Sequence, residues 1–193
     1  MKKMIYLACA FLACDDTVTQ SASDSIASGK SAFAKGEYEK AISYFEEAIK
    51  LDAKLVDGYR GLGFSQLRLN TAQKSTLTSA KKTFKSGLDV SNDLDCQIGL
   101  VLISYALETE MSVAIDFAKN ISDSYQNSID KDLSTDDVKY HLSWLYFKSK
   151  NYAASETLAK ALATKLNISY EAFNGSTESI KLAKLLDGLR SKV

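Results

Sequence analysis

Few residues in this sequence have the type and spacing that chemistry requires. His141 is the only histidine among 193 residues, so the chain cannot supply several imidazole ligands to one metal ion. Cys96 lies in the apolar run CQIGLVLISYAL, with no surrounding motif of a cysteine nucleophile. The acidic residues are scattered at the spacings of solvated helix surfaces. These patterns predict no catalysis, no cofactor and no metal.

One glycine-rich stretch, GYRGLG at residues 58–63, could suggest a phosphate-binding loop. A phosphate loop of that kind needs a preceding strand and a following Lys-Ser or Lys-Thr pair, and the sequence provides neither. The stretch instead opens a predicted helix, where small residues allow a neighbouring helix to approach closely. We interpret these glycines as packing residues.

The composition is that of one folded, helical domain. It is 46% hydrophobic and 25% charged, and it contains no proline. Abundant Ala, Leu, Lys and Glu favour helices, and the absence of proline suits a chain of helices joined by short turns. The 24 basic residues are balanced by 24 acidic residues, so no general basic surface for nucleic acid is expected.

A pattern of small and aromatic residues recurs along the chain. In GEYEKAISYFEEAIKLDA, residues 36–53, small or apolar side chains follow one another at spacings of four and then three. The same spacing occurs four times, at Ala41-Phe45-Ala48, Ala80-Phe84-Gly87, Ala114-Ala118-Ile121 and Ser155-Ala159-Leu162. A second apolar helical segment precedes the later three, so the repeating unit is helix, turn, helix.

This unit resembles the tetratricopeptide (TPR) repeat, a helical hairpin of 34 residues. The units begin near residues 22, 56, 95 and 136, and the second contains an insertion around TAQKSTLTS. The resemblance covers residues 22–168 and implies an all-α fold, a superhelical stack of about four TPR-like hairpins. A helix at 176–192, capped by Ser176, is expected to cover the last apolar face with Ile180, Ala183, Leu186 and Leu189. The repeat domain as a whole is placed at 23–193. An alternative for the last helix is binding to a membrane surface.

The resemblance also implies a groove formed by the first helix of each hairpin, which would bind a protein or peptide client. Projection onto this sequence assigns the partner contacts to Arg60, Phe64, Ile103, Tyr140, Trp144 and Phe147, with Asp57, Leu67, Cys96 and Gly99 beside them. Co-chaperone members of the family grip a C-terminal carboxylate with Lys, Asn and Arg. The matching positions here are Ile26, Lys30, Gly61, Cys96 and Leu100, so chaperone-tail binding is not expected.

The aromatic residues of the fourth hairpin admit two readings. Tyr140, Trp144 and Phe147 share one helical face and would be strong anchors for a peptide if they were exposed. The C-terminal helix or the linker 122–137 could instead cover them. A closed aromatic pocket near Trp144 would favour a ligand-binding or enzyme-accessory domain, whereas an open groove would favour a peptide client.

The N-terminus resembles a bacterial lipoprotein signal. Two lysines precede an apolar run at residues 4–13, which is too short to span a membrane. In the box Phe11-Leu12-Ala13-Cys14, Ala13 would be the small residue before cleavage and Cys14 the residue that receives lipid, such as palmitate. The resemblance implies a signal peptide at 1–13, a lipidated Cys14 and a tether at 14–22. The alternative is that residues 1–14 begin a buried helix.

Together these features predict a non-catalytic scaffold of the bacterial cell envelope. The lipid would be its only membrane attachment, and the domain would face the periplasm. The sequence does not distinguish the inner from the outer membrane, and it leaves the client and the oligomeric state open.

Overall fold

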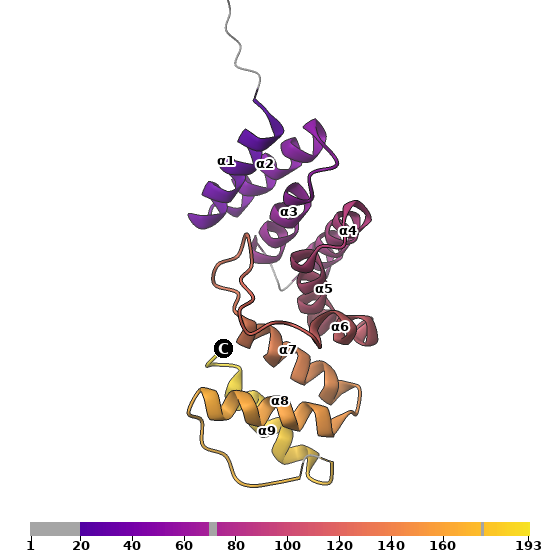
Figure 1. Ribbon diagram of the computed structural model, residues 1–193, viewed down its shortest axis with the longest axis vertical. Helices are drawn as coiled ribbons and strands as arrows, with labels where there is room; N and C mark the ends of the chain where they lie inside the picture. Colours follow the sequence, from indigo (N-terminus) through magenta and orange to yellow (C-terminus); the bar gives the residue numbers. More distant parts are fainter. Residues whose placement is uncertain (1–19, 70–72, 175) are drawn as a thin grey trace, which may run out of the picture.

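The computed structural model describes residues 20–69, 73–174 and 176–193. Within these ranges the chain forms nine helices and no strand (Figure 1). The helices are α1 (Ala22–Ala34), α2 (Tyr38–Leu51), α3 (Val56–Leu69), α4 (Lys74–Val90), α5 (Leu94–Leu107), α6 (Met111–Ala118), α7 (Thr135–Lys148), α8 (Tyr152–Lys165) and α9 (Ser179–Leu189). In the described part of the chain, none of these helices is long and apolar enough to cross a membrane.

Consecutive helices pair into four hairpins, α1–α2, α3–α4, α5–α6 and α7–α8, which follow one another along the long axis of the molecule (Figure 1). The odd-numbered helices also contact one another in order, from α1 to α9. We call the side that they form the inner face. The predicted all-α stack of four TPR-like hairpins with a C-terminal helix is therefore confirmed.

The recurring small and aromatic residues allow the helices to pack closely, because the phenylalanines of α2 and α4 lie directly against glycine backbones. Phe84 of α4 is fully buried, with Gly63 at one edge of its ring and Gly99 at the other. A Cβ on Gly63 would lie 2.5 Å from the ring, and one on Gly99 would lie 2.4 Å from it. Phe45 also touches two glycines, Gly29 and Gly61, both at the Cδ1, Cε1 and Cζ atoms of its ring. Glycine at these positions lets successive helices approach closely enough to bury the ring.

The third hairpin begins one residue earlier than the sequence pattern predicts. Gly99 meets Phe84 as Gly61 meets Phe45, and Cys96 lies against the position of Gly87. This packing starts the unit at residue 94 instead of 95. Because one residue turns a helix by about 100°, the predicted inward-facing residues of α5 point elsewhere. The extra residue is absorbed in the turn before α6, where Glu108 and Glu110 both adopt φ of 53°.

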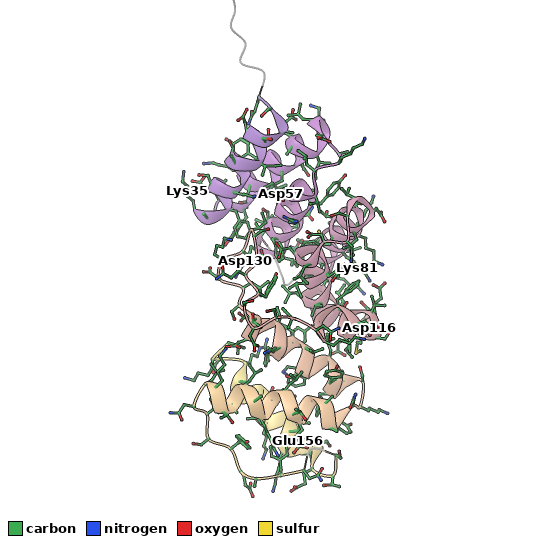
Figure 2. The ribbon with its side chains drawn as sticks, viewed as in Figure 1. Lys35, Asp57, Lys81, Asp116, Asp130 and Glu156 are labelled. Carbon is green, nitrogen blue, oxygen red and sulfur yellow. The ribbon has the colours of Figure 1, made fainter. Side chains whose placement is uncertain are left out.

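The segment between α6 and α7, residues 119–134, returns along the inner face toward α3 (Figure 1). We call it the inner loop. Arg68 of α3 donates from Nε and Nη2 to the Asp130 carboxylate at 2.7 and 2.8 Å. Asp95 of α5 accepts from the Tyr125 hydroxyl at 2.8 Å and from the Ser128 backbone at 2.9 Å. The loop is thus fixed to α3 of the second hairpin and to α5 of the third; Figure 2 labels Asp130, the loop residue bound by Arg68.

The inner loop is also stabilised by hydrogen bonds between its own residues and by apolar side chains that pack into the core. The Asn127 side chain, almost fully buried, accepts from the backbone N–H groups of Ile129 and Asp130 at 2.9 and 2.7 Å. Ile129 and Leu133 join the main apolar core. Burial beside Asp95 raises the pKa of Tyr125, so its hydroxyl keeps the proton that it donates. The loop is therefore an integral wall of the fold.

The C-terminal helix starts later than predicted. The residue before its first turn is Glu178, not Ser176, and the Glu178 carboxylate accepts from the Asn174 backbone at 3.0 Å. Its buried side chains are Leu182, Leu185, Leu186 and Leu189, which pack on Tyr140, Ala159 and Phe173. Ile180, expected on the apolar face, is 74% exposed. The helix covers the end of the stack, but with a face rotated from the predicted one.

Candidate functional site

The structure separates the six residues assigned to the groove. Phe64 and Ile103 are core residues, exposed by 1% and 0%, and Tyr140 is exposed by 3%. Ile103 cannot touch a partner because the one-residue shift in α5 turns it into the core. Arg60, Trp144 and Phe147 keep partial exposure. Cys14, the predicted lipid attachment residue, lies outside the described residues.

Arg60 belongs to a row of charges on the inner face of α1 and α3. Lys30 pairs with Asp57 at 2.7 Å, Asp57 with Arg60 at 2.6 Å, and Arg60 donates from Nε to Asp93 at 2.8 Å. Burial alone would raise the pKa of Asp93, but the hydrogen bonds from Arg60 and from the Cys96 backbone lower it below its usual range. The Arg60 guanidinium is therefore already bound within the fold.

The aromatic face of α7 is largely covered by α9. Trp144 donates from Nε1 to the Tyr140 hydroxyl at 2.9 Å, and its ring meets Phe147 edge to face at 5.4 Å between centroids. The four leucines of α9 pack against Tyr140, with Trp144 and Phe147 at the margin of this cluster. Of the two alternatives, aromatic residues exposed to a peptide or aromatic residues covered by another part of the chain, the structure shows the second, with the C-terminal helix as the cover. One side of Trp144 still lines a cavity.

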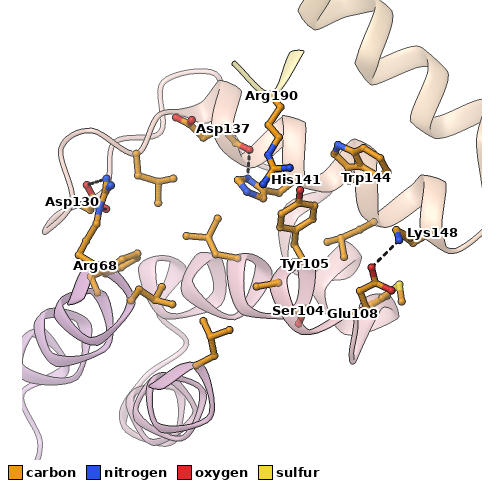
Figure 3. Close-up of a pocket in the computed structure, with 18 of the residues that line it drawn as sticks. Arg68, Ser104, Tyr105, Glu108, Asp130, Asp137, His141, Trp144, Lys148 and Arg190 are labelled. Carbon is orange, nitrogen blue, oxygen red and sulfur yellow. Dashed lines mark hydrogen bonds and ion pairs between the residues drawn. The ribbon is translucent and has the colours of Figure 1, made fainter. Parts of the chain in front are cut away.

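This cavity has a volume of about 670 Å³. It lies between α5, α7 and α9, with α3 at one end and the inner loop as a further wall (Figure 3). Its polar and aromatic lining comprises Arg68, Ser104, Tyr105, Glu108, Asp130, Asp132, Asp137, His141, Trp144, Lys148, Asp187 and Arg190. Its apolar lining includes Phe64, Leu67, Leu77, Leu102, Met111, Leu133 and Leu145. A hollow of this size can hold a small ligand or a partner's side chain.

His141 of α7 lines the cavity. Its Nδ1 lies 2.6 Å from the Asp137 backbone oxygen, and its ring meets Tyr105 edge to face at 4.5 Å. Burial lowers the pKa of His141 and outweighs the opposite effect of Asp137, and the nearby Arg190 charge acts in the same direction as burial. The ring is therefore neutral at neutral pH. Figure 3 shows Arg190 reaching from α9 toward it.

Several charges around the cavity are already paired. Arg68 binds Asp130, Lys148 binds Glu108 at 2.7 Å, and Asp137 accepts from Ser134 in the capping box of α7. Within the described ranges, four charged side chains of the lining have no ion-pair partner: Asp137, which is held in the cap of α7, and Asp132, Asp187 and Arg190. The last three are exposed and mark the mouth of the cavity.

In the part of the chain that the structure describes, two kinds of catalytic group can be assessed, a metal centre and a cysteine nucleophile. No group of three or more His, Cys, Asp or Glu side chains there could hold a metal ion. Cys96 is fully buried. Burial is the main cause, and the nearby Asp93 charge the second, of a thiol pKa far above the usual range. A thiol that does not ionise and does not reach the surface cannot act as a nucleophile.

Comparison with known proteins agrees with the hairpin geometry. Residues 29–70, about a fifth of the chain, match the family model described as TPR repeat. The match runs from the middle of α1 to the end of α3, and the later hairpins repeat its arrangement. Repeats of this family generally mediate protein–protein interactions. No curated protein matches the sequence.

Of the residues that line the cavity, sequence reasoning assigned Phe64 and Trp144 to the partner contacts; among those it missed are Tyr105, Asp132, His141 and Arg190. Tyr105 could have been found by aligning Gly99 with Gly61, which would have set the correct start of the third unit. His141 carried no signal, because a single histidine on a helix is usually structural. The inner loop showed no periodicity from which its position could be inferred.

Proposed function

We propose that this protein is a non-catalytic scaffold that binds a polypeptide client at the cavity between α5, α7 and α9. The observation that carries the proposal is the position of this cavity on the inner face of a TPR-like stack. Tyr105 and Trp144 in its wall are residue types that contribute strongly to binding at interfaces.

The rest of the inner face offers less to a client. On α1 and α3, the charges of Lys30, Asp57 and Arg60 are engaged with one another. In the middle, the inner loop occupies the surfaces of Arg68 and Asp95. A client that approached this face would therefore find unpaired charges and aromatic surface together mainly at the cavity. Binding is thus concentrated in the C-terminal half of the stack.

Site-specific photocrosslinking tests this proposal. Asp187→p-benzoylphenylalanine places a crosslinker at the cavity mouth, on an exposed position of α9. Lys82→p-benzoylphenylalanine, on the exposed side of α4, is the matched control. We expect a polypeptide adduct, identified by mass spectrometry, from position 187 and not from position 82. Equal adducts at both positions, or none at either, would contradict the proposal.

A small-molecule site is the second candidate, and the inner loop supports it. Asp130, Asp132 and Leu133 wall off one side of the cavity, so it is more enclosed than an open groove. A small ligand would make the protein a ligand-binding or enzyme-accessory domain. The crosslinking experiment separates the two, because a small ligand leaves no polypeptide adduct at position 187.

The proposal also places the scaffold at a bacterial membrane, through a lipid on Cys14, with its domain in the periplasm. Its support is the sequence of residues 1–14 and the start of the folded domain soon after, with the α1 cap at Ser21. Globomycin, which blocks the lipoprotein signal peptidase, should cause an uncleaved precursor to accumulate. Cys14→Ser should release the protein from the membrane fraction. A processed protein in the presence of the drug would refute lipidation at Cys14.

A further inference from the structure

We propose that the cavity receives the side chain of a lysine or arginine presented by the client. This inference rests on the proposed function and names the chemistry that the client must carry. It derives from three features of the cavity: a fixed hydrogen-bond acceptor, an excess of carboxylates, and apolar and aromatic side chains in the lining.

The acceptor is Nε2 of His141. The Asp137 backbone oxygen can only accept a hydrogen bond, so Nδ1, 2.6 Å away, must carry the proton of the neutral ring. Nε2 then presents a lone pair. Among the described residues, no group donates a hydrogen bond to Nε2, although the ring lines the cavity. A ligand that donates hydrogen bonds, such as an ammonium or guanidinium group, would satisfy this atom.

The charges of the lining favour the same ligand. Five carboxylates face three cations, and the pairs of Arg68 with Asp130 and of Lys148 with Glu108 cancel. Three carboxylates then remain against Arg190 alone. The lining is therefore negative overall, and its free carboxylates, those of Asp132 and Asp187, lie at the mouth. A negative site favours a cation.

The apolar part of the lining suits a long aliphatic stem. It includes Leu67, Leu102, Met111 and Leu145. Lysine and arginine bury such stems against apolar surface while the charged end remains with polar partners. Rings such as those of Tyr105 and Trp144 also attract a cation over their faces. A glutamate would meet carboxylates of its own sign, and a leucine would leave Nε2 without a donor.

Arg190 is the one feature that opposes a cation. It has no ion pair within the described residues, and its charge lies near His141. The proposal therefore predicts the direction of the change in affinity: removing the Arg190 charge should strengthen the binding of a cation and weaken the binding of an anion. Removing the charges of Asp132 and Asp187 should do the reverse.

Trp144 provides the readout, because it is the only tryptophan in the chain and lines the cavity. Its single indole N–H signal can be followed by NMR during titration with blocked pentapeptides Gly-Gly-X-Gly-Gly, where X is Arg, Lys, norleucine or Glu. We expect saturable shifts with Arg and Lys, weaker ones with norleucine and none with Glu. Asp132→Asn combined with Asp187→Asn should weaken Arg and Lys binding roughly three- to tenfold, as expected for two partly exposed charge pairs. Arg190→Gln should strengthen it.

The outcomes separate this inference from the function on which it rests. If norleucine binds as well as lysine, or if only the Glu peptide binds and Arg190→Gln abolishes its binding, the cationic ligand is wrong while a polypeptide client still stands. The cationic ligand is also wrong if no peptide shifts the indole signal. If the Arg and Lys peptides bind but position 187 yields no polypeptide adduct, the cation site stands and the scaffold function fails.

Discussion

The contact of Phe84 with two glycines predicts that Gly99→Ala destabilises the protein, although alanine is the better helix former. A Cβ on Gly99 would lie 2.4 Å from Cε2 and Cζ of Phe84, whereas ordinary contacts begin at 3.4 Å. The ring has little room to withdraw, because Gly63 borders its opposite edge and Phe64 packs edge to face at 5.0 Å. The clash must therefore be relieved by separating α4 from α5.

Two opposing effects set the magnitude. Overpacking of a buried site costs about 1–3 kcal/mol, and a contact this short belongs in the upper part of that range. Replacing glycine by alanine inside a helix returns up to about 1 kcal/mol. The free energy of unfolding should fall by about 1–2 kcal/mol.

Urea denaturation followed by far-UV circular dichroism measures this change. Gly188→Ala is the matched control, because a Cβ there meets no atom within 4 Å, and it should stabilise the protein or leave it unchanged. In a protein that already carries Phe84→Leu, Gly99→Ala should lower the free energy of unfolding much less, because the clashing ring is gone. If Gly99→Ala is as stable as the wild type while Phe84 is present, the packing argument is refuted.

Three further predictions concern other parts of the molecule. Asp130→Asn should destabilise the protein by about 1–2 kcal/mol and speed amide hydrogen exchange in the inner loop, whereas Asp116→Asn, in an exposed pair, should do neither. The pKa of His141 is lowered in the folded state, so the unfolded state binds more protons as the pH falls below about 6.5. The stability that neutral His141 contributes should therefore be lost below that pH. In His141→Phe, urea midpoints measured across this range should lack that pH dependence. Leu186→Ala should cost about 2–5 kcal/mol and shift the tryptophan emission to longer wavelength, while Ile180→Ala, at an exposed position, should change neither.

The repeating architecture could be predicted because it depends on short-range patterns. The spacing of Ala41, Phe45 and Ala48 defines a helix face, and the glycines opposite the phenylalanines define where the next helix approaches. These local rules were enough for the fold class and for a helix at the end of the stack. They were not enough for Ile103 or Ile180, because an error of one residue in register rotates a side chain from the surface into the core or out of it.

The candidate site depended on contacts that no local pattern encodes. Arg68 meets Asp130 across 62 residues of sequence, and Asp95 meets Ser128 across 33. The tether and the lipid on Cys14 remain predictions from residues 1–22.

The sequence by itself determined that the chain forms helical hairpins, because apolar periodicity and small residues act between neighbouring turns and neighbouring helices. Only the tertiary structure decided which side chains remain available to a partner. The inner loop and α9 reach their places through long-range ion pairs and burial, and these contacts cover Tyr140 while they leave His141 and Trp144 facing one cavity.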